Sequence, residues 1–480
     1  MIINIEQRQG RLIISYVNSE GKVGYSQLTV PANHQFNYVY SKQKNKAIPG
    51  MKSWDGLDVT KVPAQFLNKH RLQEFFMDAG DDVTRHLFER NSPDLYVCDI
   101  ETDVTDDGFA EPEDAKNRIN SISWVHYPEC IVFGLKPLSG EECEQIEQNI
   151  NKHVEKFNKK YTFIYKEYIN EADMLYDFLY NHARHAPLIT GWNFWAYDWF
   201  YIYNRCTKRL NLDISWMSPT KQWYEHKIKD RGKTKVLMLP QHKLIVDYMA
   251  IYIKWDRTIE VKENNQLDFV SEAATGIRKV KYPGTFQEMY NNDYPLHIFY
   301  NAIDSVLVEL MDSKLKTMNT FLGLGNITRV EAMSAFSPIS MLEATLTRHA
   351  YLRNQVFPKT FDRKEREQFE GAFVFEPIPG LYEWVASFDF ASLYPSIMRQ
   401  FMISIENFII KDKLYQTTDK QIKCVSGAVF DASIEPLIPE ILTDYYGQRK
   451  EAKKISQLAE QEVDELQKIK RQRFAQTIGN

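Results

Sequence analysis

Two acidic residues follow a short apolar segment early in the chain, and their spacing allows them to act together. Asp99 and Glu101 come directly after Leu95–Cys98, a run that predicts a buried strand. Residues i and i+2 of a strand project from the same face, so both carboxylates can address one point. Taken alone, this pattern is more typical of an exposed strand end than of a site.

Two later patterns place further acids where they can join this pair. Asp198 ends the segment Asn193–Asp198, just beyond a strand expected at Leu188–Trp192. Open α/β sheets bind ligands at the carboxyl ends of their strands. On an expected helix, Tyr300 and Asp304 are four residues apart and share a face. Asp304 lies among apolar residues there, where a carboxylate requires a partner or a metal ion.

The donor set defines the chemistry that we expect. Oxygen ligands suit Mg²⁺ or Mn²⁺ and disfavour zinc. Two such ions close together can bind the attacking water and the leaving oxygen of a phosphodiester. We therefore expect Asp99, Glu101, Asp198 and Asp304 to hold two ions, with the Tyr300 hydroxyl orienting the water.

The elements that must position these residues are typical of an α/β domain within a larger chain. The length of 480 residues corresponds to three or four domains at roughly 100–200 residues each. Beyond residue 94 strands and helices are expected to alternate. We expect an α/β and α+β multidomain fold, with strands at Ser121–Val125, Leu188–Trp192 and Leu244–Asp247 and helices at Glu171–His182 and Pro295–Met318.

Composition excludes several classes of protein. A hydrophobic content of 44% and a charged content of 26% argue against a largely disordered chain. Neither a secretory signal nor a run of apolar residues long enough for a membrane helix is visible. The net charge of −5 excludes an overall basic coat but allows a local basic groove. Five scattered cysteines indicate reduced thiols, so we expect a cytoplasmic location.

In order and spacing, the three acidic patterns resemble the exonuclease motifs of family B DNA polymerases, of the tyrosine-bearing 3′–5′ proofreading type. The resemblance implies an RNase H-like exonuclease domain. It also implies that the catalytic residues are Asp99, Glu101, Asp198, Tyr300 and Asp304, in the presence of Mg²⁺ or Mn²⁺.

The resemblance continues into a second motif. Gly371–Pro377 leads to Ser387–Ile397, which is similar to motif A of these polymerases, D-x-x-S-L-Y-P-S-I. A strand expected over Tyr382–Asp389 would deliver Asp389 to catalytic Mg²⁺. The helix that follows would offer its first backbone N–H groups, those of Ser392, Leu393 and Tyr394, to phosphate oxygens.

Family likeness adds two roles at motif A. The Phe390 carbonyl is implied to bind metal, and Tyr394 to pack under the sugar and exclude a 2′-hydroxyl. Phe390 and Ala391 replace the Leu and Thr of the T-even phage type, to which the whole chain is most similar. Only the Phe390 backbone is needed, so the assignment stands. A core aromatic is the alternative for Tyr394.

Basic residues give three further candidate contacts. Gln448–Lys453 resembles the start of the fingers domain, where Arg449 and Lys453 would face the incoming triphosphate; a solvated helix face is the alternative. Lys279 and Lys281 lie at alternate positions on one face of an expected strand and could bind DNA phosphates. Arg231 and Lys233 flank Gly232 at the tip of an expected hairpin, which is either the family's strand-separating hairpin or a solvated edge.

Two polymerase motifs are missing from the sequence. Neither the K-x-x-x-N-S-x-Y-G pattern of the fingers nor the D-T-D of the palm occurs. Asp389 therefore lacks the second carboxylate of a polymerase metal site. A helix expected from about Glu440 to Phe474 carries an apolar stripe, Ile455–Ile469, with nothing to cover it.

These observations lead to a hypothesis about the whole chain, which we interpret as the amino-terminal subunit of a split replicative DNA polymerase. Its expected domains are an amino-terminal domain (1–94, completed by 325–361), the exonuclease (95–324), a partial palm (362–438) and the first fingers helix (439–480). Expected partners are primer-template and single-stranded DNA, deoxynucleoside triphosphates, a second polypeptide with the missing motifs and the thumb, and through it a sliding clamp. The alternatives are a stand-alone 3′–5′ exonuclease and a nucleic-acid-binding regulator.

Overall fold

The computed structural model describes residues 1–41, 46–89, 92–104, 108, 110–230, 232–256, 264–358, 371, 373–390 and 392–478. The chain forms two compact units. One contains Met1–Gln35 and Phe75–Ala344, and the other contains Phe36–Glu74 and Thr345–Asn480. Helices α1 (Lys69–Ala79) and α11 (Pro338–Leu352) contribute residues to both units. The domain boundaries expected from the sequence stay predictions.

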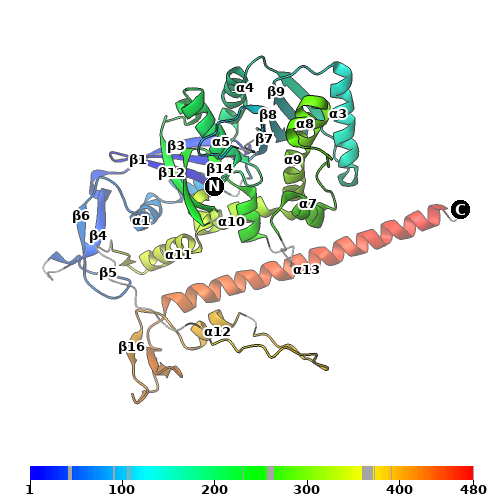
Figure 1. The fold of residues 1–480 in the computed structure, drawn as a ribbon. Coiled ribbons are helices and arrows are strands. Elements are labelled where there is room, and N and C mark those ends of the chain that lie inside the picture. The colour runs from blue at the N-terminus through cyan, green and yellow to red at the C-terminus, as the bar shows by residue number, and fades with distance from the viewer. Residues whose placement is uncertain are drawn as a thin grey trace. The chain divides into compact units, whose positions relative to one another are not determined.

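A six-stranded mixed sheet is the centre of the first unit (Figure 1). Its order is β10-β9-β8-β7-β11-β14, and β8 runs antiparallel to both β7 and β9, while the remaining pairs are parallel. The α/β class expected from the sequence is confirmed, and one reversed strand suits an RNase H-like domain. The strands are β7 (Leu95–Thr102), β8 (Ile119–His126), β9 (Glu129–Gly134), β10 (Thr162–Glu167), β11 (Leu188–Thr190) and β14 (Leu244–Ile245).

Helix α9 (Tyr294–Leu315) packs across β7, β8 and β9. It begins where the Asp293 side chain accepts the Leu296 N–H and Pro295 occupies the first turn. It ends at Lys316, whose backbone is left-handed. The other helices of this unit are α2 (Asp81–Thr84), α3 (Gly140–His153), α4 (Glu171–Asp177), α5 (Asp198–Asn204), α6 (Tyr248–Trp255), α7 (Leu267–Thr275), α8 (Phe286–Asn292) and α10 (Thr317–Thr328).

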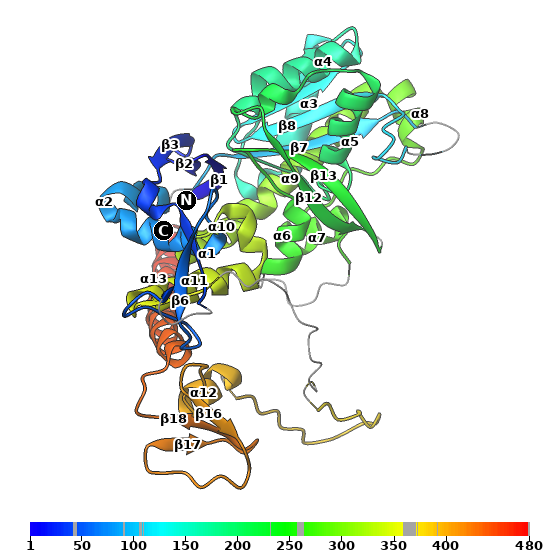
Figure 2. The same ribbon diagram turned by 90° about the vertical axis from the view of Figure 1, so that its left-hand side faces the viewer.

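Two smaller sheets complete the first unit. One is the meander β1 (Ile2–Arg8), β2 (Arg11–Val17) and β3 (Val23–Thr29). The other is the expected hairpin, formed by the long strands β12 (Trp223–Asp230) and β13 (Lys233–Pro240) (Figure 2). Gly232 adopts a positive φ of 79° at its turn, which explains a glycine at this position.

The second unit is built from small sheets, parts of α1 and α11, and two further described helices. β4 (Phe36–Tyr40) pairs with β6 (Val59–Pro63), and β5 (Lys52–Ser53) pairs with β15 (Gln355–Val356). A three-stranded sheet has the order β16-β18-β17. Its strands are β16 (Phe408–Lys411), β17 (Gln421–Lys423) and β18 (Ala428–Asp431), and the helices are α12 (Leu393–Gln400) and α13 (Leu437–Ile478).

A strand expected in the second unit is absent from its described residues. Residues 382–389 form no strand, so the prediction that a strand carries Asp389 is wrong for this structure. A strand is stable only when neighbours accept its backbone hydrogen bonds, and no strand among the described residues pairs with this segment. The large apolar side chains around it are exposed as a result: Phe373, Val374, Phe375, Ile378, Leu381, Trp384, Val385, Phe388 and Phe390.

The cysteines and the hydropathy of the helices relate to what was expected from composition. All five cysteines are unpaired, and three of them, Cys98, Cys130 and Cys206, are buried. Among the described helices, none is both long enough and apolar enough to cross a membrane.

Candidate active site

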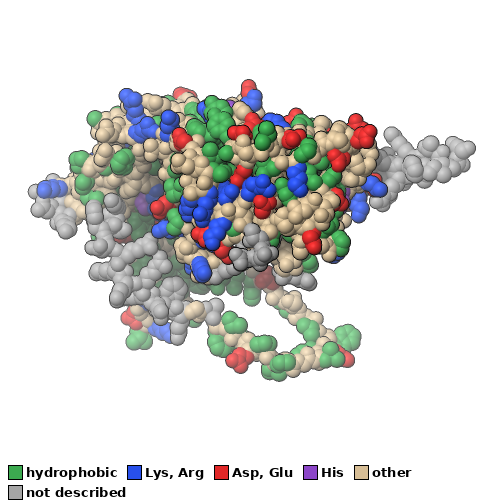
Figure 3. Space-filling view, turned by 45° about the horizontal axis from the view of Figure 1, so that its top comes forward, with side chains coloured by type: hydrophobic (Ala, Val, Ile, Leu, Met, Phe, Trp, Pro, Cys, Tyr) green, Lys and Arg blue, Asp and Glu red, His purple; other side chains and the backbone are tan. Residues whose placement is uncertain are grey.

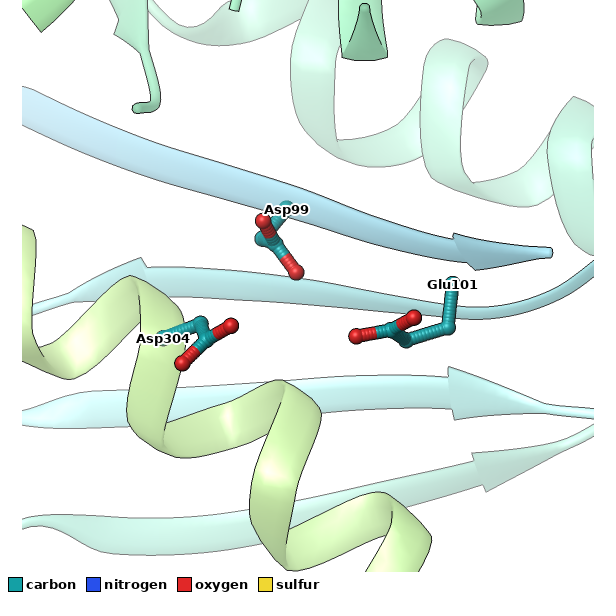
Figure 4. A group of neighbouring side chains, drawn as sticks. All are labelled: Asp99, Glu101 and Asp304. Carbon is teal, nitrogen blue, oxygen red and sulfur yellow. The ribbon is translucent and has the colours of Figure 1, made fainter. Parts of the chain in front are cut away.

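Three carboxylates from two elements meet at one point of the first unit. Asp99 and Glu101 project from the same face of β7, and Asp304 projects from α9, which packs on that strand. One oxygen of each lies within 4.8 Å of the others. Figure 4 shows an oxygen of each carboxylate pointing into the space between them. The i, i+2 spacing therefore puts Asp99 and Glu101 on one face of β7 as expected, and the packing of α9 brings Asp304 to them.

Asp198, the fourth expected acid, lies beside this group rather than within it. It is buried at the first turn of α5, and its Oδ1 accepts the Ile100 N–H at 3.2 Å. Strand β11 brings it there by pairing with β7. Just after β11, a Cβ on Gly191 would lie 2.3 Å from the Cys98 carbonyl, so only glycine allows this approach.

Burial and mutual repulsion make the group electrostatically unfavourable without a cation. Burial, and then the nearby Asp304, raises the pKa of Glu101 to about 8. Burial raises the pKa of Asp198 to about 8, although hydrogen bonds from two backbone N–H groups oppose this shift. The pKa of Asp99 is raised well above its ordinary value by burial and then by Asp198. Oδ1 of Asp304 is buried, and no described residue forms a hydrogen bond with it. This donor set fits divalent cations with oxygen ligands.

Lys279 brings a positive charge to the edge of the cluster. Its Nζ lies 2.6 Å from Asp304 Oδ2 and 4.8 Å from the centre of the Tyr300 ring. Asp304 raises the pKa of Lys279 above its ordinary value, although burial opposes the shift. Residues 277–282 form no strand, so the prediction of a strand that alternates Lys279 and Lys281 is wrong. The segment lacks a neighbouring strand, and Lys279 turns inward to an acid while Lys281 is exposed.

Tyr300 lies where the sequence expects it, one helical turn before Asp304. Its ring is nearly buried and contacts Phe286 edge-on. Burial and the charge of Asp304 raise its pKa above the ordinary value, so the hydroxyl keeps its proton at neutral pH. A protonated phenol in this position can hold a water or a phosphate oxygen by hydrogen bonding.

A cavity of about 570 Å³ opens on the carboxylates. This volume is within the range of sites that hold small ligands, about 300–1,000 Å³. Its wall combines apolar side chains with amides and with the charged groups described above. The lining residues are Asp99, Trp192, Asn193, Met249, Asn265, Gln266, Leu267, Asp268, Lys279 and Asp304.

Two contributions to the site were not expected from the sequence. The ion pair of Lys279 was missed because the two partners are 25 positions apart in a chain whose intervening path could not be predicted. Asn301 was also missed, although it stands inside the Tyr300–Asp304 pattern as a polar residue on an apolar helix. Its Nδ2 donates a hydrogen bond to Asp99 Oδ2 at 2.8 Å.

The motif A residues are in the second unit and are open to solvent. Asp389, Phe390, Leu393 and Tyr394 are exposed, and Ser392 adopts a left-handed backbone with φ of 54° at the start of α12. The helix therefore begins at Leu393, the second of the three residues whose backbone N–H groups were expected at its start.

Helices α12 and α13 pack together within this unit. Arg399 Nε donates to Thr443 Oγ1 at 3.1 Å, and its guanidinium lies 5.0 Å from the centre of the Tyr446 ring. Arg449 and Lys453 are exposed on α13, one helical turn apart. No measured contact joins these two residues to Asp389 among the described residues, so their shared role stays a prediction.

The structure describes only one of the two basic residues expected to contact DNA at the hairpin tip. Lys233 is exposed at the tip of the β12–β13 hairpin, and Arg231 lies outside the described residues. In Figure 3, acidic side chains lie among the lysines and arginines on the face drawn, so these basic residues do not form one continuous basic surface. A role of the hairpin in separating strands stays a prediction.

Comparison with known proteins gives two family matches. The model of the family B DNA polymerase exonuclease domain matches residues 62–267, and the model of DNA polymerase family B matches residues 339–480.

Curated relatives match over larger parts of the chain. The DNA-directed DNA polymerase of Escherichia phage RB69 is 29% identical over 415 residues, which cover 80% of this chain and 44% of the relative. The DNA-directed DNA polymerase of Enterobacteria phage T4 is 25% identical over an alignment of 515 positions, which covers 97% of this chain and 55% of the relative. DNA polymerase 1 of Pyrococcus abyssi is 30% identical over 155 residues, covering 31% and 19%. The chain thus spans about half the length of the two phage relatives.

Proposed function

Because this chain belongs to the family B DNA polymerases, we propose that the site at Asp99 is a proofreading 3′–5′ exonuclease acting on single-stranded DNA. The observation that carries the proposal is the convergence of Asp99, Glu101 and Asp304 within 4.8 Å, with Asp198 beside them. Burying carboxylates that repel one another costs free energy, and a regulator that only binds nucleic acid gives no reason for that cost.

The proposed roles follow from the geometry of the side chains. Asp99, Glu101, Asp198 and Asp304 would hold two Mg²⁺ or Mn²⁺ ions. Such ions supply activation of the attacking water and neutralisation of the leaving oxygen. The Tyr300 hydroxyl holds the attacking water, because it is protonated and one turn from Asp304.

Substrate binding is supported by the lining of the cavity. Trp192, Met249 and Leu267 offer apolar surface for an unpaired terminal base, and base stacking on aromatic side chains is independent of sequence. Asn193 and Gln266 offer amides to the sugar and phosphate. The Lys279 ammonium lies close enough to Asp304 to offset part of the acidic charge that would repel a phosphate.

Degradation of 5′-labelled single-stranded DNA by the purified chain tests the nuclease proposal. We expect shortening from the 3′ end with Mg²⁺, none with EDTA, and loss of activity in Asp198→Ala and Asp99→Ala. Asp389→Ala, in the other unit, serves as the matched acidic control and should leave degradation unchanged. Full activity in Asp198→Ala and Asp99→Ala would refute the assignment of the acids.

We further propose that the second unit supplies half of a nucleotide site. Asp389 and the Phe390 carbonyl would bind metal, Ser392, Leu393 and Tyr394 would contact the phosphates and sugar, and Arg449 and Lys453 would meet the triphosphate. The packing of α12 on α13 supports this, because it joins the helix of motif A to the helix that carries Arg449 and Lys453.

A second polypeptide is our proposed source of the remaining palm, fingers and thumb. The support is exposed apolar side chains in two parts of the second unit: Trp384, Phe388 and Phe390 in one segment, and Ile455, Leu458, Val463 and Leu466 on α13. Apolar surface of this extent is typical of an interface rather than of a free surface. A sliding clamp would be reached through that partner, and the cytoplasm of a phage-infected host is the proposed location.

Co-expression with a polypeptide carrying the N-S-x-Y-G and D-T-D motifs tests this second proposal. We expect a stable complex that extends a primer, and Asp389→Ala should stop extension while sparing the nuclease. Primer extension by residues 1–480 alone would refute the need for a partner. If the missing motifs are found as a continuation of the same polypeptide, the half-site stands and the split is refuted.

A further inference from the structure

Helix α9 carries a stripe of polar side chains on a face that is otherwise core. His297, Asn301 and Ser305 are spaced by four residues and therefore lie on one face of the helix. Their exposed fractions are 1%, 0% and 1%. Polar groups buried to this degree destabilise the fold unless each of them is hydrogen-bonded. A Leu or Val stripe would pack equally well, so the polar side chains require a reason.

The two outer members of the stripe bind the sheet. His297 Nε2 lies 3.1 Å from Asn120 Oδ1 and 3.2 Å from Ser121 Oγ. Ser305 Oγ lies 2.7 Å from Ser123 Oγ. All three partners belong to β8, so these contacts fix α9 on the sheet.

The central member has a different partner. Asn301 Nδ2 donates to Asp99 Oδ2 at 2.8 Å, across from β7. Asn301 Oδ1 is buried and has no hydrogen-bond partner among the residues that the structure describes. When Asp99 is ionised, as a metal ligand must be, turning the amide over would bring that oxygen against a carboxylate oxygen, so the ionised acid fixes the orientation of the amide. An amide that leaves its own oxygen unpaired to serve Asp99 is poorly explained by packing.

We propose that Asn301 is a positioning residue for the metal-binding carboxylate of Asp99. Its N–H holds Oδ2 and so restricts rotation of the carboxyl group, which keeps Asp99 directed at the point where Glu101 and Asp304 also converge. A neutral donor does this without adding charge to the site. Side chains that hold metal ligands in this way commonly set metal affinity. The inference rests on the proposed nuclease function of the site.

Direct measurement of Mn²⁺ binding tests the proposal without reference to turnover. Titration calorimetry of the metal-stripped chain, in the absence of DNA, compares wild type with Asn301→Leu, which has nearly the same volume and no donor. We expect Mn²⁺ affinity to fall about 10–100-fold. The matched control is Ser305→Ala, equally buried on the same stripe but bonded to a serine, and its Mn²⁺ affinity should match wild type.

Nuclease kinetics separate positioning from a structural defect. In Asn301→Leu the half-saturating Mn²⁺ concentration should rise by the factor found in calorimetry, while KM for single-stranded DNA stays unchanged. A structural defect would instead lower the melting temperature and kcat without moving the metal requirement. If Asn301→Leu does not fold, Asn301→Ser, which is too short to reach Asp99, replaces it with the same expectation.

The outcomes distinguish this inference from the proposed function. Wild-type chain that neither binds Mn²⁺ nor degrades DNA would refute the nuclease itself. Wild-type chain that does both, with Asn301→Leu binding Mn²⁺ as tightly, would refute only the role of Asn301.

Discussion

Replacement of Lys279 by methionine probes the charge balance of the carboxylate cluster. The Lys279 ammonium lies 2.6 Å from Asp304, and the two side chains are 24% and 5% exposed. At an effective dielectric constant of about 20, this separation corresponds to an attraction of about 6 kcal/mol. Desolvation offsets part of that attraction, and removal of one partner from a buried pair typically costs about 3–5 kcal/mol. Since Lys279 is partly solvated, we expect a loss of about 3 kcal/mol in the free energy of unfolding.

The loss should depend on metal, which makes the measurement specific. Urea unfolding in EDTA at pH 8 should show the full destabilisation of Lys279→Met, because no metal ion then offsets the charge of Asp304. In saturating Mg²⁺ the difference from wild type should shrink, since bound cations take over that role and stabilise the folded state. Lys281→Met is the control, because Lys281 is two residues away and exposed.

Two results would refute this reasoning. Equal stability of Lys279→Met and wild type in EDTA would mean that the ion pair contributes nothing to the cluster. A loss of the same size with and without Mg²⁺ would mean that Lys279 stabilises the fold by packing alone.

The other predictions concern the Tyr300 hydroxyl, the close backbone approach at Gly191 and the pH dependence of stability. Tyr300→Phe should lower kcat of the nuclease about 100-fold with an unchanged half-saturating Mg²⁺ concentration, as measured by gel assay; an unchanged kcat would exclude the hydroxyl. Gly191→Ala should destabilise the chain by at least about 2 kcal/mol in urea, because its Cβ meets the Cys98 carbonyl at 2.3 Å. Burial raises the pKa of Glu331 to about 7, so its contribution is most favourable below its unfolded pKa and is lost as pH rises through 7. Across pH 5–8 the free energy of unfolding of wild type should fall by up to about 3 kcal/mol more than that of Glu331→Gln, because both proteins share the contributions of Glu101 and Asp198.

Short-range spacing made the acids of the site predictable. Asp99 and Glu101 share a strand face because side chains alternate, and Tyr300 and Asp304 share a helix face because four residues complete about one turn. Each of these relations lies within five residues, where backbone geometry alone decides direction. The chain order of the three patterns then indicated the family, which the matches to residues 62–267 and 339–480 confirm.

Relations between distant segments were not predictable in the same way. The sequence suggested that Lys279 faces DNA from a strand, but the segment has no strand beside it and the side chain pairs with Asp304. The strand expected at Tyr382–Asp389 failed for a related reason. Alternation of side chains describes a possible strand, whereas a strand forms only when a neighbour accepts its hydrogen bonds.

By itself, the sequence indicated the chemistry expected of this protein: carboxylates in three ordered patterns, a tyrosine one turn from an acid, and a segment similar to motif A. Only the tertiary structure decided the electrostatics, because burial and the packing of α9 on β7 set which charges meet. It placed Asp198 beside the cluster, brought Lys279 to Asp304, and aimed the amide of Asn301 at Asp99. Charges and hydrogen bonds act through space, so residues 202 positions apart become neighbours only once the sheet and helix have packed.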